Sequence, residues 1–201
     1  MDRIFINYSI EMCRQLWLAS MPVLPRVVVR GRKNPLYFGF AERLRRARKA
    51  AGWSLAALAR ASNSTAPTIL PLERGERCPR VDTAEKLARA LSFSPSLLAF
   101  GISHPYEPAT RMFCDGLANR LYEARAARGI SMRELEQLAD AAGNLVRNTE
   151  GGRSLPTLRT IEQLSKALDV SPAWLAYGQG PMDVSVRKRA STEERAQHGP
   201  R

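Results

Sequence analysis

The sequence has few of the residues from which disulfide frameworks and metal sites are built. Its 201 residues include three cysteines and two histidines. The cysteines, Cys13, Cys78 and Cys114, are odd in number and widely spaced, so they form neither a disulfide framework nor a metal-ligand pattern. We therefore expect a reducing, cytoplasmic setting and no bound metal or other cofactor.

Catalytic motifs are also lacking. Neither His104 nor His198 stands in a recognisable arrangement with a Cys or Ser nucleophile. There is no glycine-rich phosphate loop, no paired His motif and no carboxylate cluster with metal spacing. The sequence favours a protein that is not an enzyme and has no catalytic residues.

Long apolar runs are missing as well. No uncharged apolar stretch approaches the roughly 18–20 residues that a membrane span requires. The most apolar N-terminal segment, Ile10–Leu24, contains Glu11 and Arg14 and lacks the basic start of a signal peptide. We expect no membrane association.

Acidic residues are outnumbered by basic ones. The chain has 31 Lys+Arg against 19 Asp+Glu, a formal charge of +12 and a pI of about 10.5. This excess indicates a polyanionic partner, with DNA as the first choice and anionic lipid as the second.

An internal repeat organises the chain. A shift of 77 positions aligns Phe40–Gly101 with Leu117–Gly178 without a gap, and 22 of the 62 aligned residues are identical. One folding unit has therefore been used twice. We predict one domain at residues 40–101 and another at 117–178, joined by a linker at 102–116.

Each repeat has the pattern of short helices. Apolar residues recur at helical spacing, as in residues 44–51, and no stretch of either repeat alternates with period two. Gly52 and Gly129 are typical helix ends, and Ser54 and Ser131 follow them as N-caps. The predicted fold class is all-α, with about five short helices in each repeat.

The order Arg48-x3-Gly52-x-Ser54-x3-Leu58, followed by Glu73-Arg74-Gly75, resembles the lambda-repressor-like helix-turn-helix family, the phage repressor/Cro or XRE type. The second repeat carries the same skeleton at Arg125, Gly129, Ser131, Leu135, Glu150 and Gly152. The resemblance implies two tandem five-helix domains. In this family helix 3 enters the DNA major groove and dimers bind two half-sites.

The resemblance also assigns helices and ion pairs by position. It implies helix 2 over Leu55–Ala61 and Met132–Ala139, and recognition helix 3 over Thr65–Leu72 and Gly143–Thr149. It further implies that helix 1 is tied to the end of helix 3 by the structural ion pairs Arg48–Glu73 and Arg125–Glu150.

The second recognition segment carries side chains that suit base recognition, because Asn pairs bidentately with adenine and Arg with guanine. Asn144 and Asn148 are expected to share a helix face. The N–H groups after Ser54 or Ser131 are a further candidate phosphate site. The DNA-binding residues predicted in this repeat are Ser131, Gly143, Asn144, Arg147, Asn148 and Arg153. The alternative is an ordinary solvated face.

The first recognition segment departs from the pattern at its prolines. Pro67 suits a first helical turn, whereas Pro71 removes a backbone hydrogen bond and costs about 3 kcal/mol inside a helix. We therefore expect helix 3 of this repeat to be short or kinked and its base recognition to be weak. Thr65 and Thr68 are its predicted base contacts.

The two repeats differ in charge. Residues 40–101 have 11 Lys+Arg and 5 Asp+Glu, whereas residues 117–178 have 8 and 7. We hypothesise that the first domain is an electrostatic anchor and the second the main base reader. The predicted phosphate contacts in the first domain are Arg74, Arg77 and Arg80, and the basic run Arg43–Lys49 is expected to be mainly a solvated face.

The linker leaves the arrangement of the domains open. Its 15 residues, extended at about 3.3–3.6 Å each, can span about 50 Å. This exceeds the roughly 34 Å between half-sites, so one chain can place both domains on one duplex, as a homodimer does with two chains. The alternative is that the domains pack together around Tyr106 and Phe113.

The ends match neither repeat. Residues 1–39 carry six basic and two acidic residues, and we expect an arm of low order. A DNA-tracking arm, a dimerisation segment and sequence upstream of a later start at Met12 or Met21 all stay open. The basic tail, residues 179–201, is expected to be disordered.

Together these features favour a sequence-specific double-stranded DNA-binding protein, a transcriptional regulator of the cytoplasm and its nucleoid. The rival interpretation is a protein-interaction or dimerisation scaffold whose helix-turn-helix units have lost base recognition. Pro71 favours the scaffold, whereas Asn144, Arg147 and the net charge favour DNA binding.

Overall fold

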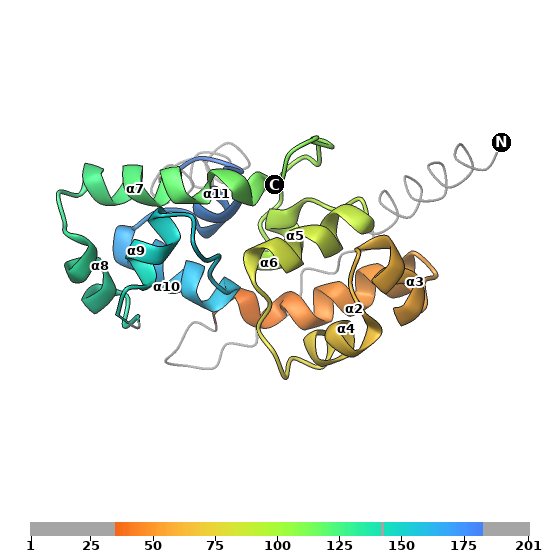
Figure 1. Ribbon diagram of the computed structural model, residues 1–201. Coiled ribbons are helices and arrows are strands. Elements are labelled where there is room, and N and C mark those ends of the chain that lie inside the picture. The colour runs from red at the N-terminus through yellow and green to blue at the C-terminus, as the bar shows by residue number, and fades with distance from the viewer. Residues whose placement is uncertain (1–34, 142, 183–201) are drawn as a thin grey trace, which may run out of the picture. The chain divides into compact units, whose positions relative to one another are not determined.

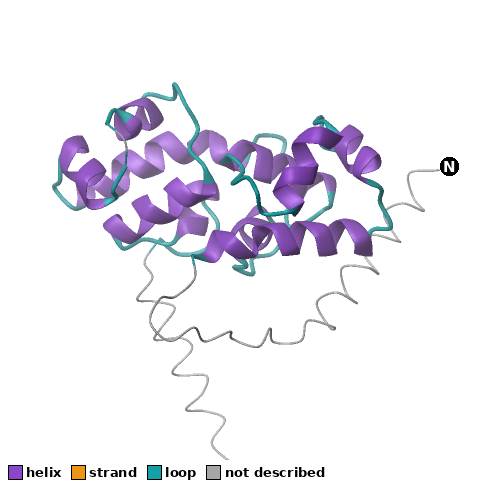
Figure 2. Cartoon of the chain, turned by 90° about the horizontal axis from the view of Figure 1, so that it is seen from below, coloured by secondary structure: helices purple, strands orange, loops and turns teal. Residues whose placement is uncertain are grey.

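The computed structural model of the 201-residue chain describes residues 35–141 and 143–182. Within these ranges there are ten α-helices and two short 3-10 helices, and no β-strand (Figure 1 and Figure 2). No helix in the described part is long and apolar enough to cross a membrane. The predicted all-α class is confirmed.

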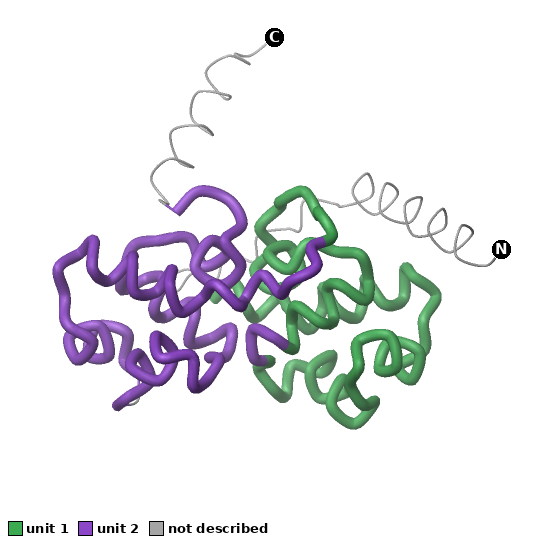
Figure 3. The backbone as a smooth tube through the Cα atoms, turned by 45° about the horizontal axis from the view of Figure 1, so that its top comes forward, with its two compact units in different colours: residues 1–79, 83–108 green, residues 80–82, 109–201 purple. Residues whose placement is uncertain are grey.

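The described residues divide into two compact units, coloured separately in Figure 3. Unit 1 comprises residues 35–79 and 83–108, and unit 2 comprises residues 80–82, 109–141 and 143–182. Each unit is built around five α-helices that follow one 3-10 helix. The helix count expected for each repeat is therefore confirmed.

Unit 1 is formed by η1 (Leu36–Gly39), α2 (Phe40–Ala50), α3 (Leu55–Ala61), α4 (Ala66–Glu73), α5 (Val81–Ala90) from its third residue on, and α6 (Pro95–Phe100). Gly52 has a φ of +68° just after α2, a left-handed conformation that glycine adopts without steric cost. Ser54 then caps α3, since its side-chain oxygen accepts a hydrogen bond from the Ala57 N–H at 3.1 Å.

Unit 2 is formed by η2 (Phe113–Gly116), α7 (Leu117–Ala127), α8 (Met132–Leu138), α9 (Leu145–Glu150), α10 (Leu158–Leu168) and α11 (Pro172–Tyr177). Gly129 repeats the left-handed turn of Gly52, with a φ of +66°. Pro172 occupies the first position of α11, directly after Ser171. A backbone N–H at this position would make no hydrogen bond within the helix, so proline is tolerated there.

Each unit has its own apolar core, and the two cores use equivalent positions. Leucine and β-branched side chains from all five helices are at most 1% exposed in both units. The equivalent pairs are Leu44 and Leu121, Leu58 and Leu135, Ile69 and Val146, Leu87 and Leu164, and Leu98 and Leu175. The repeat found in the sequence is thus a repeat of the buried core.

The repeated structure extends beyond the two stretches aligned in the sequence, residues 40–101 and 117–178. The 3-10 helices η1 and η2 also lie 77 positions apart, although Leu36 and Phe113 differ. Residues 113–116, which the sequence placed in the linker, therefore belong to unit 2. Residues 36–39, which it placed in the N-terminal arm, belong to unit 1.

The C-terminal boundary also changes. Gln179 is 3% exposed, and the Ser171 N–H donates to the Met182 carbonyl at 2.8 Å. Residues 179–182 are thus folded onto unit 2, which corrects the expectation that the tail is disordered from residue 179. The remaining expectations for the arm and the tail concern residues 1–34 and 183–201, which lie outside the described residues.

Replacement of Ser54 by alanine is expected to lower the free energy of unfolding by about 1 kcal/mol, because the N-terminal turn of α3 loses its side-chain cap. Urea unfolding of the full chain measures this loss. Ser54→Thr keeps a capping hydroxyl and should recover most of the stability. A loss as large in Ser54→Thr as in Ser54→Ala would contradict a capping role.

Candidate nucleic-acid interface

The two helix-turn-helix segments are α3–α4 in unit 1 and α8–α9 in unit 2. The turn of each begins with a short polar residue in the left-handed conformation, Asn63 with a φ of +50° and Asp140 with a φ of +48°. Asn and Asp tolerate this region better than other non-glycine residues. The sequence thus provides the turn residue twice at equivalent positions.

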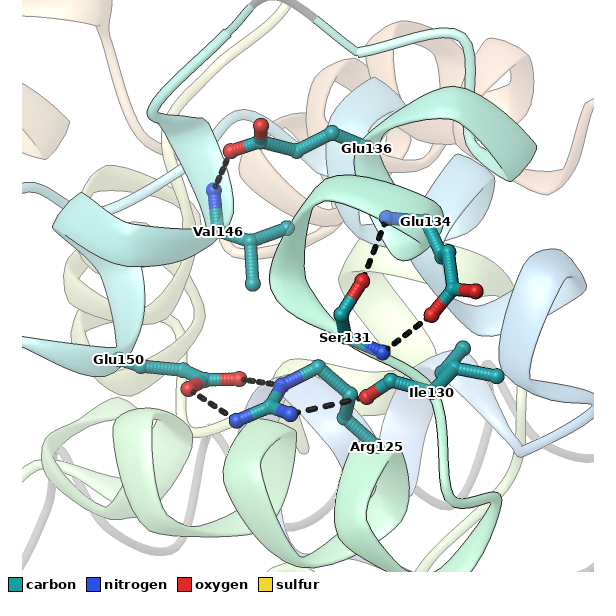
Figure 4. Close-up of polar contacts among 7 residues, drawn as sticks. All are labelled: Arg125, Ile130, Ser131, Glu134, Glu136, Val146 and Glu150. Carbon is teal, nitrogen blue, oxygen red and sulfur yellow. Dashed lines mark hydrogen bonds and ion pairs between the residues drawn. The ribbon is translucent and has the colours of Figure 1, made fainter.

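Both predicted ion pairs between helix 1 and helix 3 are present. In unit 1, Arg48 Nε and Nη2 lie 2.6 and 2.8 Å from the two Glu73 carboxylate oxygens. In unit 2, Arg125 makes the same bidentate contact with Glu150 at 2.7 and 2.9 Å, as Figure 4 shows. These hydrogen bonds raise the pKa of both guanidinium groups above the ordinary arginine value.

Each arginine also holds the chain that follows helix 1. Arg48 Nη1 donates to the Trp53 carbonyl at 2.8 Å, and Arg125 Nη1 donates to the Ile130 carbonyl at 2.9 Å. The side chains of both ion pairs are at most 14% exposed. One guanidinium therefore fixes the end of the recognition helix relative to helix 1 and to the entry of helix 2.

In unit 1 the recognition helix α4 is not short. It has eight residues, two more than α9, and it continues through Pro71. Pro71 removes one backbone hydrogen bond, whereas buried Ile69 and Leu72 and the Glu73 ion pair hold the helix on the core. The expectation of a short helix is wrong because tertiary packing outweighs this local cost.

The predicted base contacts of unit 1 lie at the start of α4. Thr65 is its N-cap residue and Thr68 is on its exposed side. Their hydroxyl groups are hydrogen bonded to each other at 2.8 Å. This face therefore offers two hydroxyl groups and no charged side chain.

In unit 2 the recognition helix α9 begins later than the sequence suggested. Its first residue is Leu145, so Gly143 and Asn144 precede it. Asn144 is the N-cap residue with a φ of +67°, and its side chain makes no capping hydrogen bond. Asn144 therefore lies at the boundary of α9, where its carbonyl accepts from the Asn148 N–H at 2.9 Å.

The other predicted contacts of unit 2 differ in exposure. Arg147 is exposed on α9, whereas Asn148 is partly buried. Arg153 is exposed just beyond the helix, where its backbone N–H donates to the Asn148 carbonyl at 2.8 Å. Arg147 and Arg153 are thus the two cations that this segment presents to solvent.

The start of α8 is already occupied by a carboxylate. Ser131 Oγ accepts from the Glu134 N–H at 3.2 Å, and a Glu134 carboxylate oxygen accepts from the Ser131 N–H at 2.7 Å (Figure 4). The bond from the Ser131 backbone lowers the pKa of Glu134. Two of the N–H groups at this helix start, those of Ser131 and Glu134, are therefore already hydrogen bonded within the protein.

A second carboxylate caps the recognition helix of unit 2, and the sequence interpretation missed it. Glu136 projects from α8, and its Oε1 accepts from the Val146 N–H at 3.0 Å (Figure 4). The residue equivalent to Glu136 in the first repeat is Ala59, which has no such group. The replacement of Ala59 by Glu136 between two otherwise similar helices was therefore the sequence signal for this cap.

Two further arginines that the sequence interpretation missed hold the last helix of each unit. Arg43 donates to the Leu98 and Ala99 carbonyls at 2.8 and 2.7 Å. Arg120 makes the equivalent contacts to Leu175 and Ala176 at 2.9 and 2.8 Å. These carbonyls lie at helix C-termini, where cations are favourable.

Each of these arginines also bonds the preceding 3-10 helix, at Leu36 or Phe113. Burial lowers the pKa of Arg43 to about 10, so its side chain stays charged at neutral pH. Arg43 is therefore not part of a solvated face. The sequence contained a signal for this structural role. Arg43 is repeated as Arg120, whereas the neighbouring Arg45 is not repeated as an arginine.

The remaining cations of the first repeat lie at the surface. Arg74, Arg77 and Arg80 are exposed after α4, and contacts assign Arg80 to unit 2 rather than unit 1. Arg45 and Arg46 are exposed on α2, and both pair with Glu42. The two cations that follow the end of the recognition helix are thus Arg74, which pairs with Glu76 at 3.7 Å, and Arg77.

Comparison with known proteins agrees with this geometry. A helix-turn-helix family model matches residues 44–98 and again residues 121–175, which together exceed half of the chain. The chain belongs to the helix-turn-helix family. The match is of the lambda-repressor-like, XRE type, so the family inferred from the sequence is confirmed.

One relative of this helix-turn-helix protein is the HTH-type transcriptional regulator PrtR of Pseudomonas aeruginosa strain PAO1. The two proteins are 32% identical over 74 residues. The matched region covers 37% of this chain and 28% of PrtR, so the chain matches well under half of that protein's length.

Proposed function

We propose that this helix-turn-helix protein binds double-stranded DNA sequence-specifically and regulates transcription in the nucleoid. Unit 2 serves as the main base reader and unit 1 as an electrostatic anchor. The observation that carries the proposal is exposed Arg147 on α9, a helix whose end is fixed by the buried Arg125–Glu150 pair. The name of the relative PrtR, a transcriptional regulator, supports the biological role.

The reader role rests on the chemistry of α9. Arginine can donate two hydrogen bonds to guanine O6 and N7 in the major groove. Arg147 is exposed, and its neighbours Val146 and Thr149 are buried, so the helix is anchored on one side and presents Arg147 on the other. A fixed helix favours this contact because its backbone does not have to become ordered when Arg147 binds the duplex.

The anchor role rests on charge. Residues 40–101 have an excess of six positive charges over negative ones, whereas residues 117–178 have an excess of one. Arg74 and Arg77 directly follow α4, where phosphate contacts position the protein without selecting a sequence. Thr65 and Thr68 add two weaker hydrogen-bonding groups on the same helix.

Selection of bound fragments from random duplex DNA tests the proposal, with the full chain and two salt concentrations. We expect one sequence to be enriched and its binding to weaken as salt rises. A palindromic site would indicate a homodimer, whereas two unlike half-sites would indicate that one chain places both units on the duplex. Retention without any enriched sequence would contradict sequence-specific regulation.

A protein-interaction scaffold is the second candidate. It is favoured by the carboxylates of Glu134 and Glu136, which cap both helices of the motif in unit 2 and would repel phosphates. Absence of DNA retention even at low salt would support this scaffold.

Arg147→Ala is expected to relax the base preference and to weaken binding to the selected site by about 1–3 kcal/mol, the usual contribution of one bidentate base contact. Competition between the selected site and its single-base variants measures both effects. Arg133 is exposed on α8, and Arg133→Ala removes the same charge but should leave the base preference unchanged. An unchanged preference in Arg147→Ala would remove Arg147 from the interface.

A further inference from the structure

The recognition helices of the two units begin at different points of the repeat. Helix α4 begins at Ala66, whose equivalent in the second repeat is Gly143. Helix α9 begins two residues later, at Leu145. The first part of the recognition helix in unit 1 is therefore replaced in unit 2 by a non-helical segment that includes Gly143 and left-handed Asn144.

A side chain of α8 takes over the hydrogen bond that this change removes. In unit 1 the Ile69 N–H donates to the Thr65 carbonyl at 3.1 Å, a bond within the first turn of α4. In unit 2 the equivalent N–H, that of Val146, donates to Glu136 Oε1 at 3.0 Å. Ala59 could not make this bond in unit 1, because it has no acceptor on its side chain.

The later start changes the position of Arg147 in the helix. Arg147 is the third residue of α9, whereas the equivalent Leu70 is the fifth residue of α4. In helix-turn-helix proteins the N-terminal residues of the recognition helix contact the base edges. The start of α9 at Leu145 thus brings Arg147 into the turn from which bases are read.

We propose that Glu136 is a positioning residue for base recognition by unit 2, and this rests on the proposed function. Its carboxylate substitutes for the missing first part of the recognition helix, sets the start of α9 and thereby places Arg147. Val146 is fully buried, so its N–H has no access to bulk water as a replacement partner. The side chain of Asn144 does not cap the helix either.

The short length of α9 makes this cap more important. A helix of six residues has too few internal hydrogen bonds to be stable alone and depends on its contacts with the rest of the unit. Its C-terminal end is held by the Arg125–Glu150 pair. Glu136 provides the corresponding restraint at the N-terminal end, so the helix is fixed at both ends.

Three substitutions separate the hydrogen bond from the charge. Glu136→Gln keeps a carbonyl oxygen at the same reach but removes the charge. Glu136→Asp keeps the charge but shortens the side chain by one methylene group, which takes the carboxylate away from the Val146 N–H. Glu136→Ala removes both, and Glu134→Gln is the charge-matched control on the same helix.

Amide hydrogen exchange of Val146 in the full chain tests the placement without DNA. We expect exchange to accelerate at least tenfold in Glu136→Ala and Glu136→Asp and to stay within a few-fold of the parent protein in Glu136→Gln. Equal protection of Val146 in all three variants would overturn the proposal. This measurement also identifies any variant in which the whole unit unfolds, because every core amide would then lose protection.

Competition binding with the selected DNA site tests the function. The ratio of specific to non-specific affinity should fall about 5- to 150-fold in Glu136→Ala and Glu136→Asp, the equivalent of losing one base contact of about 1–3 kcal/mol at 1.4 kcal/mol per tenfold change. The loss should fall on the base pairs that Arg147→Ala affects. Glu136→Gln should keep the ratio and, like Glu134→Gln, bind all sequences more tightly.

The outcomes separate this inference from the proposed function. If the parent protein selects no sequence, the proposed function fails, and the inference fails with it. If Arg147→Ala relaxes the preference while Glu136→Ala and Glu136→Asp do not, the DNA-binding function stands and the role of Glu136 is refuted. A loss in Glu136→Gln with none in Glu136→Asp would show that the charge, rather than the hydrogen bond, matters, and would overturn the proposal.

Discussion

Arg125→Ala is expected to lower the free energy of unfolding of unit 2 by about 3–5 kcal/mol, the usual cost of removing one partner from a buried ion pair. The substitution leaves the Glu150 carboxylate, 6% exposed, without its two charge-assisted hydrogen bonds. It also frees the Ile130 carbonyl. A loss of this size is a large part of the stability of a small domain.

Arg128→Ala is the matched control for this prediction. Arg128 lies three residues further along the chain and pairs with Asp169 at 3.4 Å, but these side chains are 42% and 72% exposed. Exposed pairs contribute only about 0.2–1 kcal/mol. Urea unfolding of the full chain, followed by circular dichroism, compares the two variants. A loss in Arg125→Ala no greater than that in Arg128→Ala would contradict the structural role of the buried pair.

Simultaneous replacement of Arg74 and Arg77 by alanine is expected to reduce DNA affinity about 60-fold at 0.1 M salt and to lower the salt slope by about 1.8. Each phosphate that a cation neutralises contributes about 0.9 to the slope of log affinity against log salt. Two contacts therefore contribute about 1.8 to the slope. Over the tenfold change in salt from 1 M to 0.1 M, this slope corresponds to a factor of about 60 in affinity. Base preference should not change, since phosphate contacts carry no sequence information.

Arg45 and Arg46 provide the control for charge alone. They are exposed on α2 in the same unit and already pair with Glu42. Replacing both with alanine removes the same charge but should change the slope much less, because these side chains do not follow the recognition helix. Equal salt slopes in the two double variants would refute the anchor role of Arg74 and Arg77 and would indicate a general effect of net charge.

Much of the fold could be predicted because its signals are local. Gly52 and Gly129 end a helix because glycine adopts the left-handed backbone conformation without steric cost. Ser54 and Ser131 cap the next helix by accepting a hydrogen bond from the backbone N–H three residues further along the chain. The constant offset of 77 then showed that these signals occur twice. The family resemblance implied the Arg48–Glu73 pair, and the offset showed that both of its residues are repeated as Arg125 and Glu150.

The candidate site was less predictable, because its features depend on neighbours in space. Pro71 was expected to shorten or kink α4, yet the helix has eight residues and its Ile69 and Leu72 side chains are buried. The start of α9 was placed at Gly143, because periodicity does not reveal that Glu136 caps Val146 from another helix. Arg43 was assigned to a solvated face, although its partners are 55 and 56 residues away.

The order of the residues was enough to predict the helical class, the duplicated unit, the helix-turn-helix family and, through the resemblance to that family, the ion pairs that tie helix 1 to helix 3. The class and the duplication follow from residue spacing, which is the same whatever the chain packs against, and the ion pairs follow from the family resemblance. Packing in three dimensions sets where the recognition helix α9 starts, whether Pro71 shortens α4 and which arginines bind carbonyls. Those outcomes depend on which buried N–H and C=O groups need partners, and folding alone brings such partners within reach.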